Sequence, residues 1–301
     1  MKNKPKVIIT GGCGFIFSHV TEYMVKRGYA VTVIDNLSEG SHPEIVDGTF
    51  DFFEEDAGSK KAYDIIVSKN PDYIIHAAAY SDVDYSIKNP IKVINNNFDS
   101  TLNIFEAARK CSNLKKLVYV STDEVYGECE HKKKEEEIVF PKNPYSCSKA
   151  FGSHLRITYD NSYPELKNKT AETRFCNVFG PRQDDRKIMP EIKESIEYNK
   201  VIPIHNKGKG YREYIYVKNI PEAVELVMLK GDRVYNVTLN DGFTVAELIQ
   251  VVQNITKKPV LTCESHRPGM DLIYQMDNSR IKKLGWKPKW TFKDGIKDYL
   301  C

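Results

Sequence analysis

Short apolar runs alternate with longer amphipathic stretches through the first half of the chain. β-Branched and aliphatic runs bounded by Gly, Pro, Ser or Asp are typical of strands, and apolar positions that recur with helical periodicity are typical of helices. The pattern predicts strands near 6–10, 30–34, 49–53, 72–76, 115–120 and 170–175, and helices at 15–27, 59–69, 91–110 and 145–163. Strands and helices that alternate in this way form right-handed βαβ units. We therefore expect an α/β fold built on a doubly wound parallel sheet of the Rossmann type.

The rhythm becomes irregular after about residue 176. The pattern there predicts strands near 201–204, 213–217, 233–236 and 271–276, and helices near 188–198, 218–229, 244–254 and 278–284. A chain of 301 residues is long enough for unequal lobes that share a cleft. We expect a Rossmann domain over residues 1–175 and a smaller C-terminal lobe over residues 176–301, with some chain exchanged between them.

Composition narrows the possible partners. The chain carries 44 Lys and Arg against 41 Asp and Glu, a net charge of +3, so we expect neither a nucleic acid nor a membrane as a partner. No apolar stretch has signal-peptide or membrane-spanning length, and the seven cysteines never fall in a C-x-x-C spacing. These features predict a cytoplasmic protein with reduced thiols and no metal site. The charge block His131–Glu137 is expected to be a solvated loop tip.

A glycine-rich turn, Thr10–Phe17, follows the first predicted strand. Glycines at 11 and 14 let the backbone approach a pyrophosphate at the N-terminus of the next helix, although glycines after a strand also serve ordinary tight turns. Phe17 occupies the position where a third glycine is usual. The turn predicts a dinucleotide site that includes Gly11, Gly14, Phe15 and Ile16.

An acidic residue ends the second predicted strand at a spacing typical of dinucleotide sites. Asp35 lies 21 residues beyond Gly14, close to the spacing of about 20 at which a carboxylate meets the adenosine ribose hydroxyls. Its charge repels a 2′-phosphate, and no arginine follows immediately, so the expected cofactor is NAD rather than NADP. Asp56 follows the third strand, where it can hydrogen-bond the adenine or cap a helix.

The catalytic candidates begin with Tyr145 and Lys149. Their i, i+4 spacing puts phenol and ammonium on one face of a helix, and a nearby cation is expected to lower the pKa of Tyr145 so that it can act as a base. A pair at this spacing also occurs by chance on helix surfaces. The strand near 115–120 is followed by Ser121 and Thr122, whose hydroxyls can bind the oxygen that Tyr145 deprotonates. This combination favours the catalytic interpretation, in which Tyr145 and Lys149 also contact the cofactor.

The motifs resemble those of one enzyme family. Thr10–Phe15, Ser121–Gly127 and Pro144–Ser146 together are similar to the extended short-chain dehydrogenase/reductase family, and within it to the dTDP-glucose and UDP-glucose 4,6-dehydratases. The likeness runs nearly end to end. Its decisive part is the acid pair Asp123 and Glu124, because related epimerases and decarboxylases keep the Tyr-x-x-x-Lys but lack these adjacent acids.

The resemblance implies a dehydration that leaves the cofactor unchanged at the end. NAD takes hydride from C4 of the glucose while Tyr145 takes the hydroxyl proton, and the new ketone acidifies the C5 proton. Glu124 is then assigned as the base at C5 and Asp123 as the acid for the departing C6 hydroxyl, before hydride returns to C6. The nearest alternative is a 4-epimerase or decarboxylase of the same family, and an inactive NAD-binding scaffold is the alternative from another class. The implied catalytic set is Thr122, Asp123, Glu124, Tyr145 and Lys149.

The resemblance also predicts binding partners. Planar guanidinium groups bind a diphosphate bidentately, so Arg212 and Arg267 are expected to hold the nucleoside diphosphate of a nucleotide sugar. The helices at 91–110 and 145–163 resemble the pair that forms an intersubunit four-helix bundle in this family, so a homodimer is expected. Further candidates for substrate binding are Ser81, Asn177 and Lys187.

The choice of nucleotide sugar depends on weaker features. In the segment at 80–85, Asp82 and Tyr85 stand where the sequence usual in bacterial members of this family, Glu-Ser-His-Val-Asp-Arg-Ser-Ile, has a histidine and an arginine. Gly14–Val20 and Ile281–Trp286 resemble the dehydratase half of plant UDP-rhamnose synthase. This likeness favours UDP-glucose over dTDP-glucose and a product on the route to rhamnose or another deoxysugar.

Overall fold

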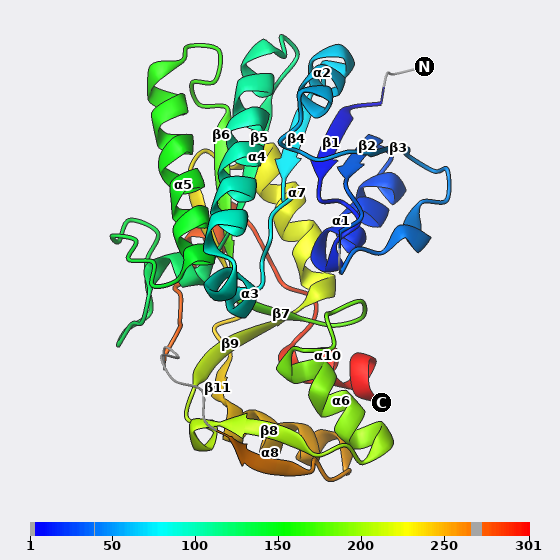
Figure 1. The fold of residues 1–301 in the computed structure, drawn as a ribbon, viewed down its shortest axis with the longest axis vertical. Helices are drawn as coiled ribbons and strands as arrows, with labels where there is room; N and C mark the ends of the chain where they lie inside the picture. The colour runs from blue at the N-terminus through cyan, green and yellow to red at the C-terminus, as the bar shows by residue number, and fades with distance from the viewer. Residues whose placement is uncertain (1–3, 39, 266–272) are drawn as a thin grey trace.

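A parallel sheet forms the centre of the molecule. The computed structural model describes residues 4–38, 40–265 and 273–301, and seven strands within these ranges form the sheet in the order β10-β6-β5-β4-β1-β2-β3 (Figure 1). All neighbours pair in parallel, and the chain runs outward from β1 in both directions. The predicted α/β fold with a doubly wound parallel sheet is confirmed. The strands are β1 Lys6–Thr10, β2 Ala30–Asp35, β3 Asp51–Glu54, β4 Tyr73–His76, β5 Lys116–Thr122, β6 Thr170–Phe175 and β10 Val234–Val237.

Helices cover both faces of this sheet. Successive side chains of a strand point to opposite faces, so neighbouring residues of β1 enter different cores. Ile8 packs in one core with Ile104 of α4, whereas Val7 and Ile9 pack in the other with Val224 of α7. Helices α2, α4 and α5 lie on the first face, and α1 and α7 lie on the second (Figure 1). The bounds are α1 Phe15–Lys26, α2 Lys60–Lys69, α4 Pro90–Lys110, α5 Pro144–Ser162 and α7 Ile220–Lys230.

Helix α5 begins with a capping box that fixes its first turn. The Asn143 side chain accepts a 2.7 Å hydrogen bond from the Ser146 amide, and the Ser146 hydroxyl accepts one of 3.2 Å from the Asn143 amide. Pro144 occupies the first helical position, where the missing N–H would have no helical partner. Tyr145 follows directly, so these caps determine where its phenol points.

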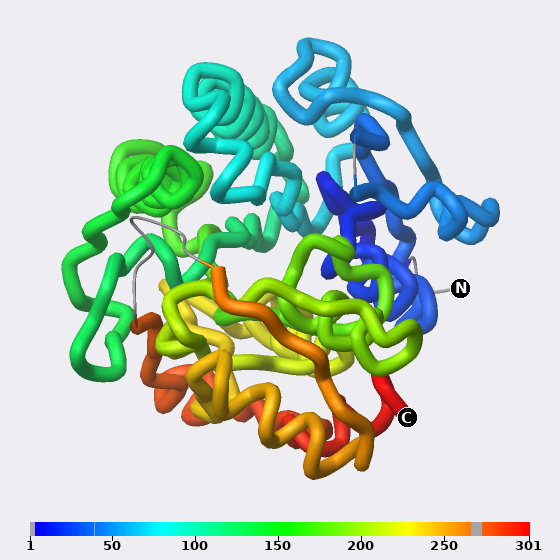
Figure 2. The backbone as a smooth tube through the Cα atoms, turned by 60° about the horizontal axis from the view of Figure 1, so that its bottom comes forward, coloured from blue at the N-terminus to red at the C-terminus, as the bar shows by residue number. Residues whose placement is uncertain are grey.

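The C-terminal half of the chain adds a smaller lobe. Among the described residues, β11, β9 and β7 form a second sheet, while β12 and β8 pair separately. The rings of Phe179, Tyr216 and Phe292 meet in its core, with centroids 5.3 and 5.4 Å from that of Phe179. Figure 2 shows these later segments, from green to red, gathered on the side opposite the cyan helices. The elements are β7 Asn177–Phe179, α6 Ile188–Tyr198, β8 Ile202–His205, β9 Tyr211–Tyr216, β11 Gly242–Thr244, α8 Val245–Thr256, β12 Thr262–Ser265 and α10 Phe292–Leu300.

The chain passes between the lobes more than once. Helix α7 and strand β10 follow residue 176 in sequence, yet they pack on and complete the large sheet. The short helix α9 (Ser279–Leu284) packs on both of them. The division of the chain after residue 175 stays a prediction. The predicted strand near 271–276 falls partly outside the described residues, and Ile273 and Met276 within it form isolated bridges.

The charge block His131–Glu137 is partly buried and hydrogen-bonds to the C-terminal half of the chain. The Lys133 amide donates a 3.0 Å hydrogen bond to the Gln275 carbonyl. The Glu135 side chain is only 8% exposed and accepts a 3.0 Å bond from the Asn236 amide of β10. The prediction of a solvated loop tip is therefore wrong, because pairing with the C-terminal half buries part of the block.

Within the described ranges, no helix is long and apolar enough to cross a membrane. The cysteines are free thiols, and burial raises the pKa of those in the interior, so these thiols are poor nucleophiles at neutral pH. The cytoplasmic location stays a prediction. The buried cysteines are Cys13, Cys111, Cys129 and Cys176.

A buried ionic cluster joins β6 to α5. Glu172 of β6 is fully buried and accepts a 2.7 Å hydrogen bond from Arg174 Nε and one of 2.6 Å from the Ser153 hydroxyl. Arg156 Nε of α5 lies 3.5 Å from the other carboxylate oxygen. Burial raises the pKa of Glu172, but the two arginines and the Ser153 hydroxyl more than offset it and keep the pKa below its usual value. The carboxylate is therefore charged, and it neutralises the positive charge of the two buried arginines.

Removing this carboxylate tests the cluster. Glu172→Ala leaves buried guanidinium groups without their counter-ion, so we expect the free energy of unfolding to fall by about 3–5 kcal/mol. Glu165→Ala removes a carboxylate of the exposed pair with Arg109 and serves as the control, with an expected change of about 0.5 kcal/mol or less. Urea unfolding of the variants and the wild type measures both. Similar losses in the two variants would contradict the assignment.

Candidate active site

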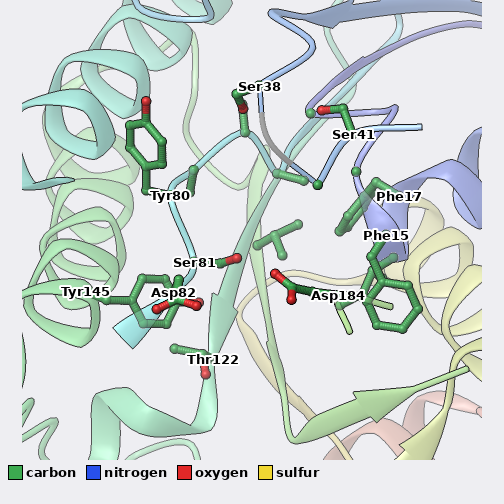
Figure 3. A pocket seen from close by; sticks show the side chains of 18 of the residues that line it. Phe15, Phe17, Ser38, Ser41, Tyr80, Ser81, Asp82, Thr122, Tyr145 and Asp184 are labelled. Carbon is green, nitrogen blue, oxygen red and sulfur yellow. The ribbon is translucent and has the colours of Figure 1, made fainter. Parts of the chain in front are cut away.

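A cavity of about 620 Å³ opens where the strands of the large sheet end. Its walls come from the ends of β1, β2, β4 and β5, and segments of the second lobe close the other side (Figure 3). Ligands of doubly wound sheets bind at this edge, beside the point where strand order reverses. Most of the predicted residues meet here: Gly11, Gly14, Phe15, Ile16, Asp35, Asp56, Ser81, Thr122, Glu124, Tyr145, Lys149, Asn177 and Lys187 all line the cavity.

The glycine-rich turn approaches its neighbours too closely for side chains. Gly11 has a φ of +69°, and a Cβ there would lie 2.7 Å from the Ala78 amide nitrogen. A Cβ at Gly12 would lie 2.8 Å from a Val33 methyl, a requirement that the sequence prediction missed. Gly14 is the N-cap of α1 and offers no side-chain cap to the first helical amides. These amides therefore remain available to an anionic group in the cavity.

Phe17 is accommodated without a third glycine. Its ring is 5% exposed, and its centroid lies 6.4 Å from that of Phe175 at the end of β6. Phe17 also lines the cavity (Figure 3). The side chain thus fills space between α1 and the sheet that a glycine leaves open.

The acidic residues at the ends of β2 and β3 differ in their surroundings. Asp35 is buried and accepts 2.9 Å hydrogen bonds from the amides of Cys13 and Leu37, which ties the glycine-rich turn to the loop after β2. Asp56 is exposed and accepts a 2.7 Å bond from the Gly58 amide. Ser59, not Asp56, caps α2, so the alternative of a helix cap at Asp56 is wrong.

The acid pair follows β5 directly, with each carboxyl in a different setting. Asp123 is 4% exposed and, unlike the other predicted catalytic residues, does not itself line the cavity. Its Oδ1 accepts a 3.0 Å hydrogen bond from the Thr122 hydroxyl, while its Oδ2 has no hydrogen-bond partner among the described residues. Glu124 is half-buried, lines the cavity and accepts a 2.9 Å bond from the Asn143 side chain. Burial, and then the negative charge of Glu124, raise the pKa of Asp123 to about 7. A protonated Asp123 is therefore well populated at neutral pH.

Tyr145 and Lys149 of α5 are both buried, and Tyr145 lies close enough to the acid pair to feel its charge. Burial, and then the charges of Glu124 and Asp123, raise the pKa of Tyr145 above its usual value. Burial lowers the pKa of Lys149 to about 7, although Glu172 opposes the shift, and Lys149 Nζ lies 4.5 Å from the Tyr119 ring centroid. The prediction that Lys149 lowers the pKa of Tyr145 is wrong for the protein alone, because burial penalises both charged forms.

Two asparagines hold the site and were not among the predicted residues. Asn143 contributes the capping box of α5 and the hydrogen bond to Glu124. Asn97 is buried in α4 and bonds the amide and carbonyl of Tyr80 and, at 2.8 Å, the Ser148 hydroxyl of α5. The Asn-Pro step before Tyr145 is a helix-start signal that could have identified Asn143. Asn97 has no such local signal, because its partners are distant in sequence.

The substrate candidates lie partly at the cavity. Asn177 begins β7, and Lys187 is the N-cap of α6. Arg212 of β9 does not line the cavity: its guanidinium donates to the Tyr211 carbonyl at 2.8 Å and lies 4.4 Å from the Tyr274 ring centroid. Arg267 lies outside the described residues. Among the described residues, no cluster of His, Cys, Asp and Glu is arranged to hold a metal ion.

Residues 8–299 match the model of the family described as GDP-mannose 4,6 dehydratase. The chain belongs to that family. The resemblance to sugar-nucleotide dehydratases that the motifs predicted is thereby confirmed. The Arabidopsis thaliana trifunctional UDP-glucose 4,6-dehydratase/3,5-epimerase/reductase RHM2 is 32% identical over 98% of the chain, which spans only 46% of that relative.

Solved structures of this family's fold superpose closely. The UDP-glucose 4-epimerase of Thermotoga maritima, solved with UDP-glucose, has a TM-score of 0.91 at 29% identity, with 98% of this chain and 97% of that one covered. The dTDP-glucose 4,6-dehydratase DesIV of Streptomyces venezuelae, solved with NAD, has a TM-score of 0.90 at 26% identity, with 98% and 95% covered. Dehydratases and epimerases thus share the backbone on which this dehydratase-family site is built.

The raised pKa of Asp123 has a measurable effect on stability. Because the pKa is about 7 in the folded protein against 3.8 for a free Asp, the native state holds the proton more tightly, and Asp123 makes folding less favourable as pH rises from about 4 to 7. Asp123→Asn removes this effect. We therefore expect the difference in free energy of unfolding, variant minus wild type, to be about 2–3 kcal/mol larger at pH 8 than at pH 5. Urea unfolding at the two pH values measures it.

The control is Asp64→Asn, an exposed residue of α2, whose difference from the wild type should stay constant between these pH values. A difference for Asp123→Asn that is equally constant would show that burial does not shift this carboxyl.

Proposed function

We propose that this chain is an NAD-dependent sugar-nucleotide 4,6-dehydratase that removes water from glucose linked to UDP or dTDP. The observation that carries the proposal is the acid pair at the end of β5, where the buried Asp123 and the cavity-lining Glu124 adjoin Tyr145 in different surroundings. Elimination of water needs a base and an acid at adjacent carbons, and carboxyl groups in different surroundings can serve these roles.

The cavity fits an NAD molecule. The close approach at Gly11, the uncapped amides after Gly14 and the carboxylate of Asp35 match the pyrophosphate and ribose of a dinucleotide. We assign Asp56 to the adenine and count Lys149 among the residues that contact the cofactor, since both line the cavity. When bound, NAD supplies hydride acceptance from C4 of the sugar and hydride return to C6.

Tyr145 removes the proton from the C4 hydroxyl, which Thr122 helps to position. The phenol must ionise against a pKa raised by burial, so it needs a positive charge nearby. Lys149 supplies that charge when protonated, and its pKa of about 7 leaves it protonated in a large fraction of molecules at neutral pH. The activity should therefore depend on the protonation of Lys149 as well as of Tyr145.

Glu124 removes the C5 proton, and Asp123 protonates the departing C6 hydroxyl. The assignment of Glu124 as the base is supported by its position on the cavity wall and by the hydrogen bond that its carboxylate accepts from Asn143. Asp123 has a pKa of about 7, so it carries the proton that the leaving hydroxyl requires. With hydride returned to C6, Glu124 gives a proton back to C5, and the product is the 4-keto-6-deoxy sugar nucleotide. Assignment to UDP-glucose is supported by the likeness to the Arabidopsis relative, whose further activities are not proposed for this chain.

A 4-epimerase is the second candidate, because the Thermotoga maritima epimerase shares the backbone closely. An epimerase interconverts C4 configurations and has no step that needs an acid at C6. The buried, proton-holding Asp123 therefore favours dehydration. The mass of the product separates the candidates, since dehydration lowers it by one water and epimerisation leaves it unchanged.

A homodimer through α4 and α5 is part of the proposal. These helices pack side by side, and the rings of Phe98 and Phe151 stack between them with centroids 3.9 Å apart. Leu102 of α4 is 44% exposed and Ile157 of α5 is 46% exposed. An exposed apolar surface on paired helices is typical of a subunit contact.

Glu124→Gln tests the chemistry. Gln keeps an oxygen for the Asn143 hydrogen bond but cannot accept the C5 proton, so we expect water loss from UDP-glucose or dTDP-glucose to fall by about 10²–10⁴-fold. C4 oxidation should persist, visible as NADH absorbance. Mass spectrometry of the nucleotide sugar and absorbance at the NADH band measure the two steps. Glu130→Gln, an exposed acid of the same segment, should retain wild-type activity, and undiminished water loss in Glu124→Gln would refute its role as base.

Leu102→Glu tests the dimer. A buried charge at a subunit contact is costly, so we expect the variant to elute as a monomer while the wild type elutes as a dimer. Leu229→Glu on α7 changes a leucine of similar exposure, 48%, outside α4 and α5 and should leave the mass unchanged. Light scattering coupled to size exclusion gives the masses. A monomeric wild type would rule out the dimer.

A further inference from the structure

Asp82 links the two lobes across the mouth of the cavity. It is the N-cap of α3 (Val83–Lys88), where its Oδ1 accepts a 2.8 Å hydrogen bond from the Tyr85 amide. Its Oδ2 lies 3.5 Å from Lys187 Nζ and 3.9 Å from Arg186 Nη2, both in the segment that leads into α6. Helix α3 is itself fixed to the catalytic helix, because the Ser86 hydroxyl accepts a 3.3 Å bond from the amide that follows Pro144. Figure 3 shows the Asp82 carboxylate in the cavity.

The positive charges at this mouth are already engaged by acids. Asp184 binds Arg186 bidentately, at 2.9 Å to Nε and 2.6 Å to Nη2. Burial raises the pKa of Asp82, but the Tyr85 amide, Lys187 and Arg186 more than offset it and keep the pKa below its usual value. Asp82 is therefore a full anion that competes for the same cations as an incoming diphosphate.

We propose that Asp82 is a counter-ion that the diphosphate of the substrate displaces from Lys187 and Arg186. The inference rests on the proposed function, because it takes the ligand to be a nucleoside diphosphate sugar. Before binding, Asp82 holds the two cations over the cavity. On binding, Lys187 and Arg186 form ion pairs with the diphosphate, and these replace their ion pairs with Asp82. The exchange orders the cations without making the nucleotide bind so tightly that the product cannot leave.

Asp82→Asn isolates the charge from the cap. Asn is as good an N-cap as Asp, so the hydrogen bond to the Tyr85 amide and helix α3 should persist. With the Asp82 charge gone, Lys187 loses this carboxylate and Arg186 keeps Asp184 as its acid, so less negative charge opposes the phosphates. We expect UDP and dTDP to bind about three- to tenfold more tightly, the size expected for partly exposed ion pairs. Isothermal titration calorimetry at low ionic strength measures the dissociation constants. A residue that merely braced the lobes would give weaker binding when changed.

Salt dependence gives a second readout. In the wild type, binding replaces existing ion pairs, so screening affects both sides of the exchange. In Asp82→Asn, binding creates ion pairs that did not exist before, so its affinity should fall more steeply as salt rises over the range where the screening length shrinks from about 30 to about 8 Å. Equal salt dependence in the two proteins would contradict the exchange.

Matched variants complete the design. Asp64→Asn makes the same charge change on α2, away from the cavity, and should leave nucleotide affinity unchanged. Lys187→Gln should weaken UDP binding, and in the double variant with Asp82→Asn most of the gain should disappear, because the cation released by the first change is missing. A full gain in the double variant would show that Asp82 does not act through Lys187.

The outcomes separate this inference from the proposed function. If nucleotide binds and Asp82→Asn binds it no more tightly, the counter-ion role is wrong while dehydration stands. If the affinity rises as expected but no nucleotide sugar loses water, the counter-ion role stands and the proposed reaction is wrong. If the wild type binds neither UDP nor dTDP, both are wrong.

Discussion

The site depends on the burial of ionisable groups where β5 ends. Asp123, Tyr145 and Lys149 are all nearly excluded from water, and burial works against the charged form of each. Asp123 is consequently protonated in a large fraction of molecules at neutral pH, and Tyr145 can give up its proton only with a positive charge close by. The half-buried Glu124 is the acid that faces the cavity. In the proposed reaction, this unequal burial makes Asp123 the acid and Glu124 the base.

The frame that holds these groups was largely predictable from local patterns. Strands β1, β2, β4 and β5 are largely apolar runs covered on both faces, and α1, α2, α4 and α5 carry amphipathic periods, so each of these elements was predicted within a few residues. The structure adds β7, β11, β12, α3 and α10, which the sequence did not reveal. The added strands have three or four residues each and exist through distant pairing, as when Gly242 of β11 meets Glu213 of β9. Local patterning carries little information about such elements.

In the site, too, local features were predictable and long-range contacts were not. Motif residues such as Gly11 and Tyr145 line one cavity, and they could be named in advance because the turn and the helix that carry them are local structures. Long-range relations were not predictable: the link from Asp82 to Lys187 joins residues over a hundred positions apart. The direction of the Tyr145 shift was wrong because spacing shows which groups are neighbours but not how deeply they are buried. Depth is a property of the whole fold, and here it decides the chemistry.

The most direct test of dehydration at this site follows a deuterium label. UDP-glucose or dTDP-glucose deuterated at C4 is incubated with the protein and NAD, and the product is examined by NMR. We expect deuterium to leave C4 and appear in the methyl group at C6, because the hydride removed from C4 returns to the carbon that lost its hydroxyl. Deuterium that is found again at C4, in a hexose that keeps its C6 hydroxyl, would contradict it.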